Sequence, residues 1–429
     1  MELTRRALFL GSGSLALCAT PLTAIAGPKL DMRVWTGDDS TRISIESDKK
    51  LDFSYMVLRN RRPFRLVLDL KKTVLTSAFE SRVKRIRLDD PYIRSIRVAQ
   101  YKPTVVRLVF ELKGDVRPVF NQRNPIDTFG HRLILELGTT NRDLMKQVID
   151  RTTTPDDPIR DILKQSEPSP KQSNVVREET GRQRPKQADK KSAKTETLVV
   201  VIDPGHGGED PGAVGRRLKT YEKTVVLSIA QKLADAVNRT QGMKAILTRR
   251  RDVFLPLSRR ANIAVKERAH LFISIHADAW TSSKANGTSV FTLSTSGASS
   301  LQARWLAQTQ NRADEIGGMD FKDVGRSARD TVVDMLAETK LRYGLQLGAS
   351  VLTELKKLGP LHKSTVESAN FAVLKAQGIP SILIETGFLS NPSDERNLRN
   401  TTYQTKIAKA IYRGVCQAVK DDPSILRGA

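Results

Sequence analysis

The alternation of hydrophobic and polar residues differs between the two parts of the chain. Between residues 31 and 138, several segments alternate apolar with charged or polar residues, as strands do when one face packs in a core and the other meets water. Turn-forming residues such as Pro103 and Gly114 separate these segments. The pattern predicts an N-terminal all-β sandwich. The predicted strands include Thr41–Glu46, Phe64–Leu70, Ile93–Val98, Val105–Leu112 and His131–Leu137.

The second part, residues 198–420, is predicted to be an α/β domain. The β-branched run Val199–Ile202 has the composition of a strand buried on both faces. A helical spacing of apolar residues follows in Glu222–Asn238, and strand and helix patterns then alternate. Such alternation predicts a mixed sheet with helices on both faces. The other predicted elements are the strands Lys244–Thr248, Leu271–Ile275, Ser289–Leu293, Phe371–Leu374 and Ser381–Ile384 and the helices Leu257–Lys266 and Thr402–Lys420.

Residues 139–197, between the two parts, contain long polar and charged stretches with few aliphatic side chains. Such a segment cannot bury enough apolar surface to offset the entropy cost of ordering it. We therefore predict a flexible linker that tethers two independent domains.

Residues 1–26 resemble an export signal. Arg5 and Arg6 precede a short apolar run that ends in the small residues around Ala26, where we expect cleavage. The paired arginines favour a twin-arginine (Tat) signal, and an ordinary Sec signal is the alternative. The expected location is therefore the periplasm. No other apolar stretch approaches the roughly 20 residues of a membrane-spanning helix, so no transmembrane segment is expected after signal removal.

The chain of 429 residues carries a formal charge of +24 and a pI near 10.1, which makes acidic polymers or anionic surfaces plausible partners. The basic residues are scattered, no nucleic-acid motif is present, and aromatic residues make up only 5%, leaving few stacking platforms. Nucleic acid is therefore not the expected partner. The sandwich strands also carry arginines on their outward faces, either as a solvated face or as a basic binding surface. These are Arg65, Arg94, Arg97, Arg107 and Arg132.

Two histidines and a glutamate follow strands or loops of the α/β part. His206 comes after Val199–Ile202 and the turn Asp203–Gly205, and His276 follows the strand at Leu271. Carboxyl ends of neighbouring strands meet at one sheet edge, and the intervening loop can bring Glu222 between the imidazoles. Two imidazoles and a carboxylate are the ligand set of one catalytic zinc ion that keeps a fourth position for water. Bound zinc lowers the pKa of that water to about 7 and polarises a carbonyl, which suits amide hydrolysis.

Amide hydrolysis also needs a carboxylate that moves protons without binding the metal. Glu385 ends the apolar strand at Ser381–Ile384, and we predict that role for it; a capping or salt-bridged glutamate is the alternative. His362 lies in a loop and could contact substrate. His270 opens the strand that His276 ends, so it should lie at the opposite edge.

Four motifs in order resemble the zinc-dependent N-acetylmuramoyl-L-alanine amidases of the cell-separation type: Asp203–Gly208, Glu222, Ser274–Asp278 and Ile384–Asn391. The sandwich is similar, more diffusely, to the AMIN domain that precedes such catalytic domains. The resemblance implies that His206, Glu222 and His276 bind zinc and that Glu385 is catalytic. It also implies a peptidoglycan substrate, cleaved between the lactyl group of N-acetylmuramic acid and L-alanine. The AMIN domain would anchor the enzyme to the wall or direct it to the division site.

An insertion of about residues 296–340 does not fit a minimal hydrolase. Ser299–Ala313 and Ser327–Thr339 have helical patterns, and a long insertion beside an active site is usually functional or disordered. In division-associated relatives such an insertion inhibits the enzyme until a LytM-type activator releases it. We predict the same restraint here, with Glu315 or Glu338 as a carboxylate that reaches the metal.

Two other functions remain open at this point. The chain could be a non-catalytic wall-binding scaffold that keeps the fold, although the intact ligand set and Glu385 favour an enzyme. It could also be a zinc peptidase that acts on wall peptides.

Overall fold

The computed structural model describes residues 28–37, 40–86, 88–126, 129–138, 197–317, 334–376 and 378–424. In the helix that begins at Asp334, side chains are described from Lys340 onward. The predicted signal peptide and linker lie outside these residues. No helix in the described segments combines the length and the hydrophobicity that crossing a bilayer requires.

Residues 30–138 form two four-stranded antiparallel sheets, in the strand orders β1-β2-β8-β7 and β3-β4-β6-β5. The inward residues of both sheets make one hydrophobic core, as the period-two pattern predicts. The all-β sandwich is confirmed. Its strands are β1 (Leu30–Thr36), β2 (Ser40–Ser47), β3 (Asp52–Leu58), β4 (Phe64–Lys71), β5 (Ile93–Lys102), β6 (Val105–Leu112), β7 (Val119–Arg123) and β8 (His131–Gly138).

A short helix, α1 (Ser77–Lys84), was not predicted within the sandwich. The hydroxyl of Thr76 caps it by accepting a hydrogen bond from the backbone N–H of Phe79, at 3.2 Å. Phe79 and Val83 enter the sandwich core from this helix.

The second domain contains a six-stranded mixed sheet in the order β10-β9-β11-β14-β12-β13. The strands β10, β9, β11 and β14 are mutually parallel, and β12 pairs antiparallel with β14. The carboxyl ends of β9, β11 and β14 therefore meet at one edge of the sheet. The strands are β9 (Leu198–Pro204), β10 (Met243–Leu247), β11 (Leu271–His276), β12 (Ser289–Leu293), β13 (Glu367–Ala369) and β14 (Ser381–Glu385).

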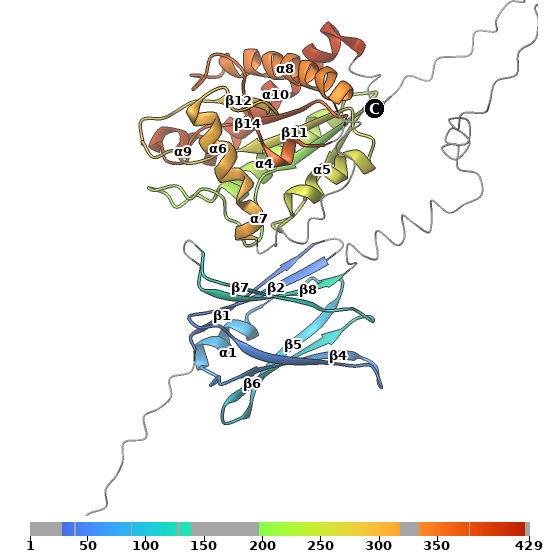
Figure 1. Ribbon diagram of the computed structural model, residues 1–429, viewed down its shortest axis with the longest axis vertical. Helices are drawn as coiled ribbons and strands as arrows, with labels where there is room; N and C mark the ends of the chain where they lie inside the picture. The colour runs from blue at the N-terminus through green and yellow to red at the C-terminus, as the bar shows by residue number, and fades with distance from the viewer. Residues whose placement is uncertain are drawn as a thin grey trace, which may run out of the picture.

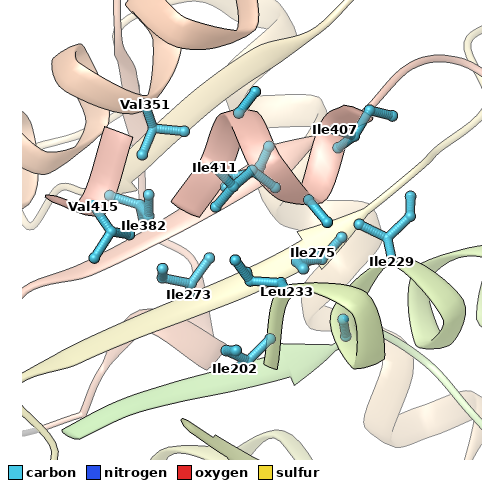
Figure 2. Packing of buried hydrophobic residues seen from close by; sticks show 14 of the residues in the cluster. Ile202, Ile229, Leu233, Ile273, Ile275, Val351, Ile382, Ile407, Ile411 and Val415 are labelled. Atoms are coloured by element: carbon cyan, nitrogen blue, oxygen red, sulfur yellow. The ribbon is translucent and has the colours of Figure 1, made fainter. Parts of the chain in front are cut away.

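Helices cover both faces of this sheet, as predicted. One face packs against α4, α8 and α10; in Figure 2, Ile273 and Ile275 of β11 belong to one cluster with Leu233 of α4 and Ile411 of α10. The other face packs against α5, α6 and a short 3₁₀ helix, η2. The helices are α4 (Glu222–Asn238), α5 (Leu257–Lys266), α6 (Leu301–Asn311), α7 (Ala313–Ile316), α8 (Asp334–Lys356), α9 (Pro392–Arg399), α10 (Thr401–Asp421) and η2 (Ala372–Leu374).

The strand predicted at Phe371–Leu374 is wrong. The chain forms the single turn of η2 there, and the backbone N–H of Ala372 donates to the side-chain oxygen of Asn311, at 2.8 Å. Phe371 is buried against Phe291, with ring centroids 5.6 Å apart. A short apolar run is compatible with a buried strand or a buried turn, and periodicity does not separate the two.

The sandwich and the α/β domain are in contact. Figure 1 shows α7 against the sheet that contains β2 and β8. Arg132 of β8, predicted on a water-facing surface, is buried in this contact and donates a hydrogen bond to the carbonyl of Ile316, at 2.6 Å. The strand pattern does identify the outward face, but a second domain covers it.

Candidate metal centre

The turn after β9 places His206 at the sheet edge. The backbone of His206 has a φ of 59°, a left-handed conformation that costs a residue with a side chain of order 1 kcal/mol and often marks a functional site. Gly205, just before it, lies against the ring of His276, where a Cβ atom would collide with the imidazole. Glycine at position 205 therefore allows the neighbouring strands β9 and β11 to bring His206 and His276 together.

The donor atoms of His206, Glu222 and His276 converge, all within 4.8 Å of one another. Oε1 of Glu222 lies 3.2 Å from Nε2 of His206 and 3.1 Å from Nδ1 of His276. All three side chains are buried. Although burial opposes ionisation, His206 and His276 hold the pKa of Glu222 well below its usual value. The cluster thus has the nitrogen and oxygen donors, the charge and the spacing of a site for a divalent metal.

Hydrogen bonds from outside the cluster orient two of the three ligands, His206 and Glu222. Nδ1 of His206 lies 2.7 Å from Oδ2 of Asp210, which leaves Nε2 directed at the cluster. Although burial lowers it, the pKa of His206 is raised well above its usual value by the charges of Asp210 and Glu222. Glu222 is held by the backbone N–H groups of Ala213 and Ala277, at 2.8 and 2.9 Å.

Two buried arginines hold the turn itself. Arg260 of α5 donates to the carbonyls of Pro204 and His206, at 2.9 and 2.8 Å, and Nη1 also contacts Asp203, at 3.0 Å. Arg249 donates to the carbonyls of Pro204 and Gly205, at 3.0 and 2.7 Å, and burial lowers its pKa to about 10. The loop of residues 204–213, which carries His206 and is called the metal loop below, therefore depends on two arginines that the sequence pattern does not single out.

Glu385 lies beside the cluster. In the sheet register it pairs with His276, the last residue of β11. Its Oε2 accepts a hydrogen bond from the backbone N–H of Asp278, at 3.0 Å, while Oε1 is buried without a hydrogen-bond partner among the described residues. Burial, together with the charges of Asp278 and Glu222, raises the pKa of Glu385 well above its usual value. A carboxyl group with a raised pKa can hold a proton that an ordinary glutamate would have released.

A small cavity of about 10 Å³ borders both histidines. This space holds about one water molecule. Besides Asp203 and Arg260, residues of the predicted insertion line it: Gln310 and Asn311 of α6 and Ala313 of α7. The insertion thus covers the metal centre in this structure.

Comparison with known proteins identifies the family of this chain. Residues 200–417 match the model of the N-acetylmuramoyl-L-alanine amidase family, and residues 31–137 match the AMIN domain. The chain belongs to this amidase family.

Relatives with the same two-part organisation support the assignment. The amidase is 39% identical to N-acetylmuramoyl-L-alanine amidase AmiC of Escherichia coli O6:H1, over 99% of this chain and 98% of that protein. It is 36% identical to AmiC of Neisseria meningitidis serogroup B, over 97% of each chain. Among solved structures, the amidase from Clostridium difficile 630 matches 53% of this chain and 98% of its own, at 25% identity and a TM-score of 0.40. The family match and the two AmiC relatives identify the protein as an N-acetylmuramoyl-L-alanine amidase that acts on peptidoglycan.

The structure of the amidase brings together four of the predicted site residues, His206, Glu222, His276 and Glu385. His362 lies elsewhere: its Nε2 is 3.0 Å from Oε1 of Gln302 on α6, and its ring packs on Phe388 with centroids 4.7 Å apart.

The two candidate carboxylates of the insertion are placed differently. Glu315 is at the surface, with 40% of its side chain exposed and Oε2 3.4 Å from Nε of Arg312. Glu338 falls in α8, outside the residues whose side chains are described.

Sequence reasoning did not single out several residues that shape the centre. They are Asp210, which orients His206, the buried Arg249 and Arg260, Asp278 beside Glu385, and Gln310 over the cavity. The run Thr248–Arg251 does signal a cation cluster after a strand, yet nothing in it indicates which arginine is buried.

Proposed function

We propose that this amidase is a periplasmic enzyme of daughter-cell separation that cleaves the bond between the lactyl group of N-acetylmuramic acid and L-alanine, with one zinc ion as cofactor. The observation that carries the proposal is the convergence of His206, Glu222 and His276 beside the buried Glu385. The leader with Arg5 and Arg6 supports export, probed by tracing the leader's removal in cell fractions.

The donor set fits zinc. Among the described residues, Nε2 of His206 is buried without a hydrogen-bond partner, as a nitrogen reserved for a metal would be. His206, Glu222 and His276 would hold the ion, leaving a fourth position for water. When bound, zinc lowers the pKa of water to about 7 and polarises a carbonyl.

Glu385 is the proton-transfer residue in this proposal. Its Oε2 is fixed by the N–H of Asp278, which leaves Oε1 to take a proton from the attacking water and later deliver it to the departing amine. The positive charge of a bound metal would lower the pKa of Glu385 from this raised value and favour release of the proton.

Metal analysis tests the cofactor. The purified protein is expected to contain one zinc per chain by elemental analysis, and Asp210→Asn to weaken zinc affinity about 10- to 100-fold, because the amide no longer sets the tautomer of His206. Asp235→Asn, at an exposed position of α4, is the control. Equal zinc affinity in the Asp210 variant and the parent would contradict the orienting role.

Product analysis tests the reaction. Glu385→Gln is expected to lower turnover on purified peptidoglycan about 10²- to 10⁴-fold while the zinc content stays at the parent level. Mass spectrometry of the parent's products should show intact stem peptides with a free L-alanine amine. Shorter peptides would indicate a peptidase, and an inactive parent that still binds the wall would indicate a scaffold.

Autoinhibition by the insertion is the second part of the proposal. A cavity of about 10 Å³ cannot admit a muramyl peptide. Gln310 is buried over it and lies close to Asp278, whose backbone N–H donates to Glu385. Asn311 fastens the end of α6 through the carbonyl of Asn370, at 2.9 Å. An activator protein of the LytM type, expected from the family, would act by displacing α6 and α7. Glu338 stays a candidate for a direct contact with the metal.

A matched pair of glutamines tests this restraint. Deleting residues 299–340 would remove the inhibitory segment, but it would also remove Ala303, Leu306 and Ala307 from the hydrophobic core. Gln310→Ala is gentler and is expected to raise the rate of peptide release in the absence of activator. Gln308→Ala, on the exposed face of the same helix, should not. Equal basal rates in the two variants would count against occlusion by Gln310.

Substrate contact by His362 also belongs to this proposal. Because Gln302 of α6 hydrogen-bonds the imidazole of His362, displacement of α6 would free that imidazole for the substrate.

The sandwich would hold the enzyme on peptidoglycan through arginines such as Arg94, which stays exposed on β5.

A further inference from the structure

The sheet formed by β1, β2, β8 and β7 has an outward face that is not open to water. Thr41 to Ile45 of β2 are buried without interruption, where alternation would leave every second residue exposed. The cover is the α/β domain, and two arginines of the sandwich, Arg42 and Arg132, dominate the contact.

These two arginines bind the end of α7. Nη1 of Arg132 donates to the carbonyl of Ile316, at 2.6 Å, and Nη2 of Arg42 donates to the carbonyl of Gly317. The last carbonyls of a helix carry partial negative charge, and guanidinium groups satisfy them well. The guanidinium of Arg42 also lies over the ring of Phe254, 5.0 Å from its centroid.

The same two arginines face Glu209, which lies in the metal loop. Nε of Arg42 is 3.6 Å from Oε1 of Glu209, and Nη1 of Arg132 is 3.5 Å from Oε2. Glu209 is buried, and a buried carboxylate is stable only when paired. Its neighbour Asp210 orients His206. The sandwich therefore contacts both the loop that carries a metal ligand and the segment that covers the metal centre.

We infer that the face of the sandwich around Arg42 and Arg132 is a docking surface for the chain's own α/β domain, and that docking holds α7 and the Glu209 loop in the closed arrangement. Undocking would expose Glu209 to water and free the carbonyls of Ile316 and Gly317. Anything that draws the sandwich away, such as wall binding, would favour opening. The inference rests on the proposed autoinhibition for its effect on activity, but not for the docking itself.

The test compares two double variants of the full chain. Arg42→Ala/Arg132→Ala removes the docking arginines, and Arg61→Ala/Arg117→Ala removes the same charge from exposed positions of the sandwich. Small-angle X-ray scattering should show a larger maximum dimension for the first variant alone. An unchanged dimension, with a folded spectrum by circular dichroism, would overturn the docking.

Peptide release from purified peptidoglycan then measures the effect of docking on the enzyme. Without activator, the Arg42→Ala/Arg132→Ala variant should be about 5- to 150-fold faster than the control, the range typical of coupling between sites. Separated domains with an unchanged rate would overturn the restraint.

Two further variants keep the outcomes distinguishable. If the double alanine variant does not fold, Arg42→Lys/Arg132→Lys keeps the charge, loses the guanidinium geometry and should give a smaller change in both measurements. If Gln310→Ala also leaves the basal rate unchanged, the proposed autoinhibition fails, while the scattering still decides the docking.

Discussion

Two arginine–aspartate pairs, one in each domain, show how differently the same chemistry is used. In the α/β domain Arg260 contacts Asp203 at 3.0 Å, with side chains 2% and 0% exposed. In the sandwich Arg107 contacts Asp69 at 2.6 Å across β4 and β6, with side chains 26% and 15% exposed. The shorter ion pair is the more exposed one. The distance between the charged groups therefore does not tell which pair contributes more to stability.

Burial decides what each pair contributes. Asp203 is fully buried, and Arg260, Thr248 and Ser274 bind its carboxylate, so that its pKa lies below the usual value although burial alone would raise it. Arg260 also binds the carbonyl of His206 and so connects the pair to the metal loop. Arg107 instead lies over the ring of Tyr101, 3.4 Å from the centroid, and joins surface strands. The buried pair therefore supports the metal centre, whereas the more exposed pair joins two strands of the sandwich.

The largest effect is expected when the buried pair loses its cation. Arg260→Met should destabilise the α/β domain by about 3–5 kcal/mol, because Asp203 is left as an uncompensated buried charge. Urea unfolding measures this loss. In a Trp35→Phe background the remaining tryptophans, Trp280 and Trp305, report the α/β domain.

A second substitution separates the lost charge from the lost packing. In Arg260→Met/Asp203→Asn no charge is left unpaired, so the double variant should recover part of the stability. A double variant no more stable than Arg260→Met would show that the aspartate charge is not the cause.

The next largest effect is expected for Lys340, a buried cation that contacts no carboxylate among the described residues. Lys340 of α8 donates to the carbonyls of Leu374, at 3.2 Å, and Ala376, and burial lowers its pKa from 10.5 to about 8. Between pH 8 and 10.5 the unfolded chain holds a proton that the folded chain lacks, so stability rises with pH in this window. The full rise is at most about 3 kcal/mol.

Substitution isolates this contribution. The stability of the parent minus that of Lys340→Met should increase from pH 8 to pH 10, because methionine does not titrate. Lys356→Met, at an exposed position of the same helix, should give a flat difference. A flat difference for Lys340 as well would mean that its ammonium group is hydrated in the folded protein.

The positions of the site residues followed from local sequence. A β-branched run that ends in Asp203–Gly205 predicts a strand and a sharp turn, and the register of β11 with β14 then places His276 beside Glu385. Glu222 begins α4 as its pattern predicts. These features depend on residues next to one another in the chain, and the resemblance to the amidases rests on the same residues.

The supporting shell could not be predicted in the same way. Arg249 and Arg260 resemble any other arginines of this basic chain, and their role arises from contacts across about 45 and 55 residues of sequence. The burial of Arg132 depends on a contact with Ile316, 184 residues away, for which a strand pattern carries no signal. Hydrophobic periodicity defines the faces of elements but not which other domain covers them.

The smallest effect is expected for the partly exposed pair. Arg107→Met should destabilise the sandwich by about 1–2 kcal/mol, because it removes a bidentate pair but Asp69 can be hydrated once the guanidinium is gone, and the loss should shrink in high salt. Trp35 follows this unfolding when Trp280 and Trp305 are replaced by phenylalanine. A loss as large as that of Arg260→Met would mean that the outer face of β4 and β6 is desolvated in solution. The difference between the two domains would then lie in their partners rather than in burial.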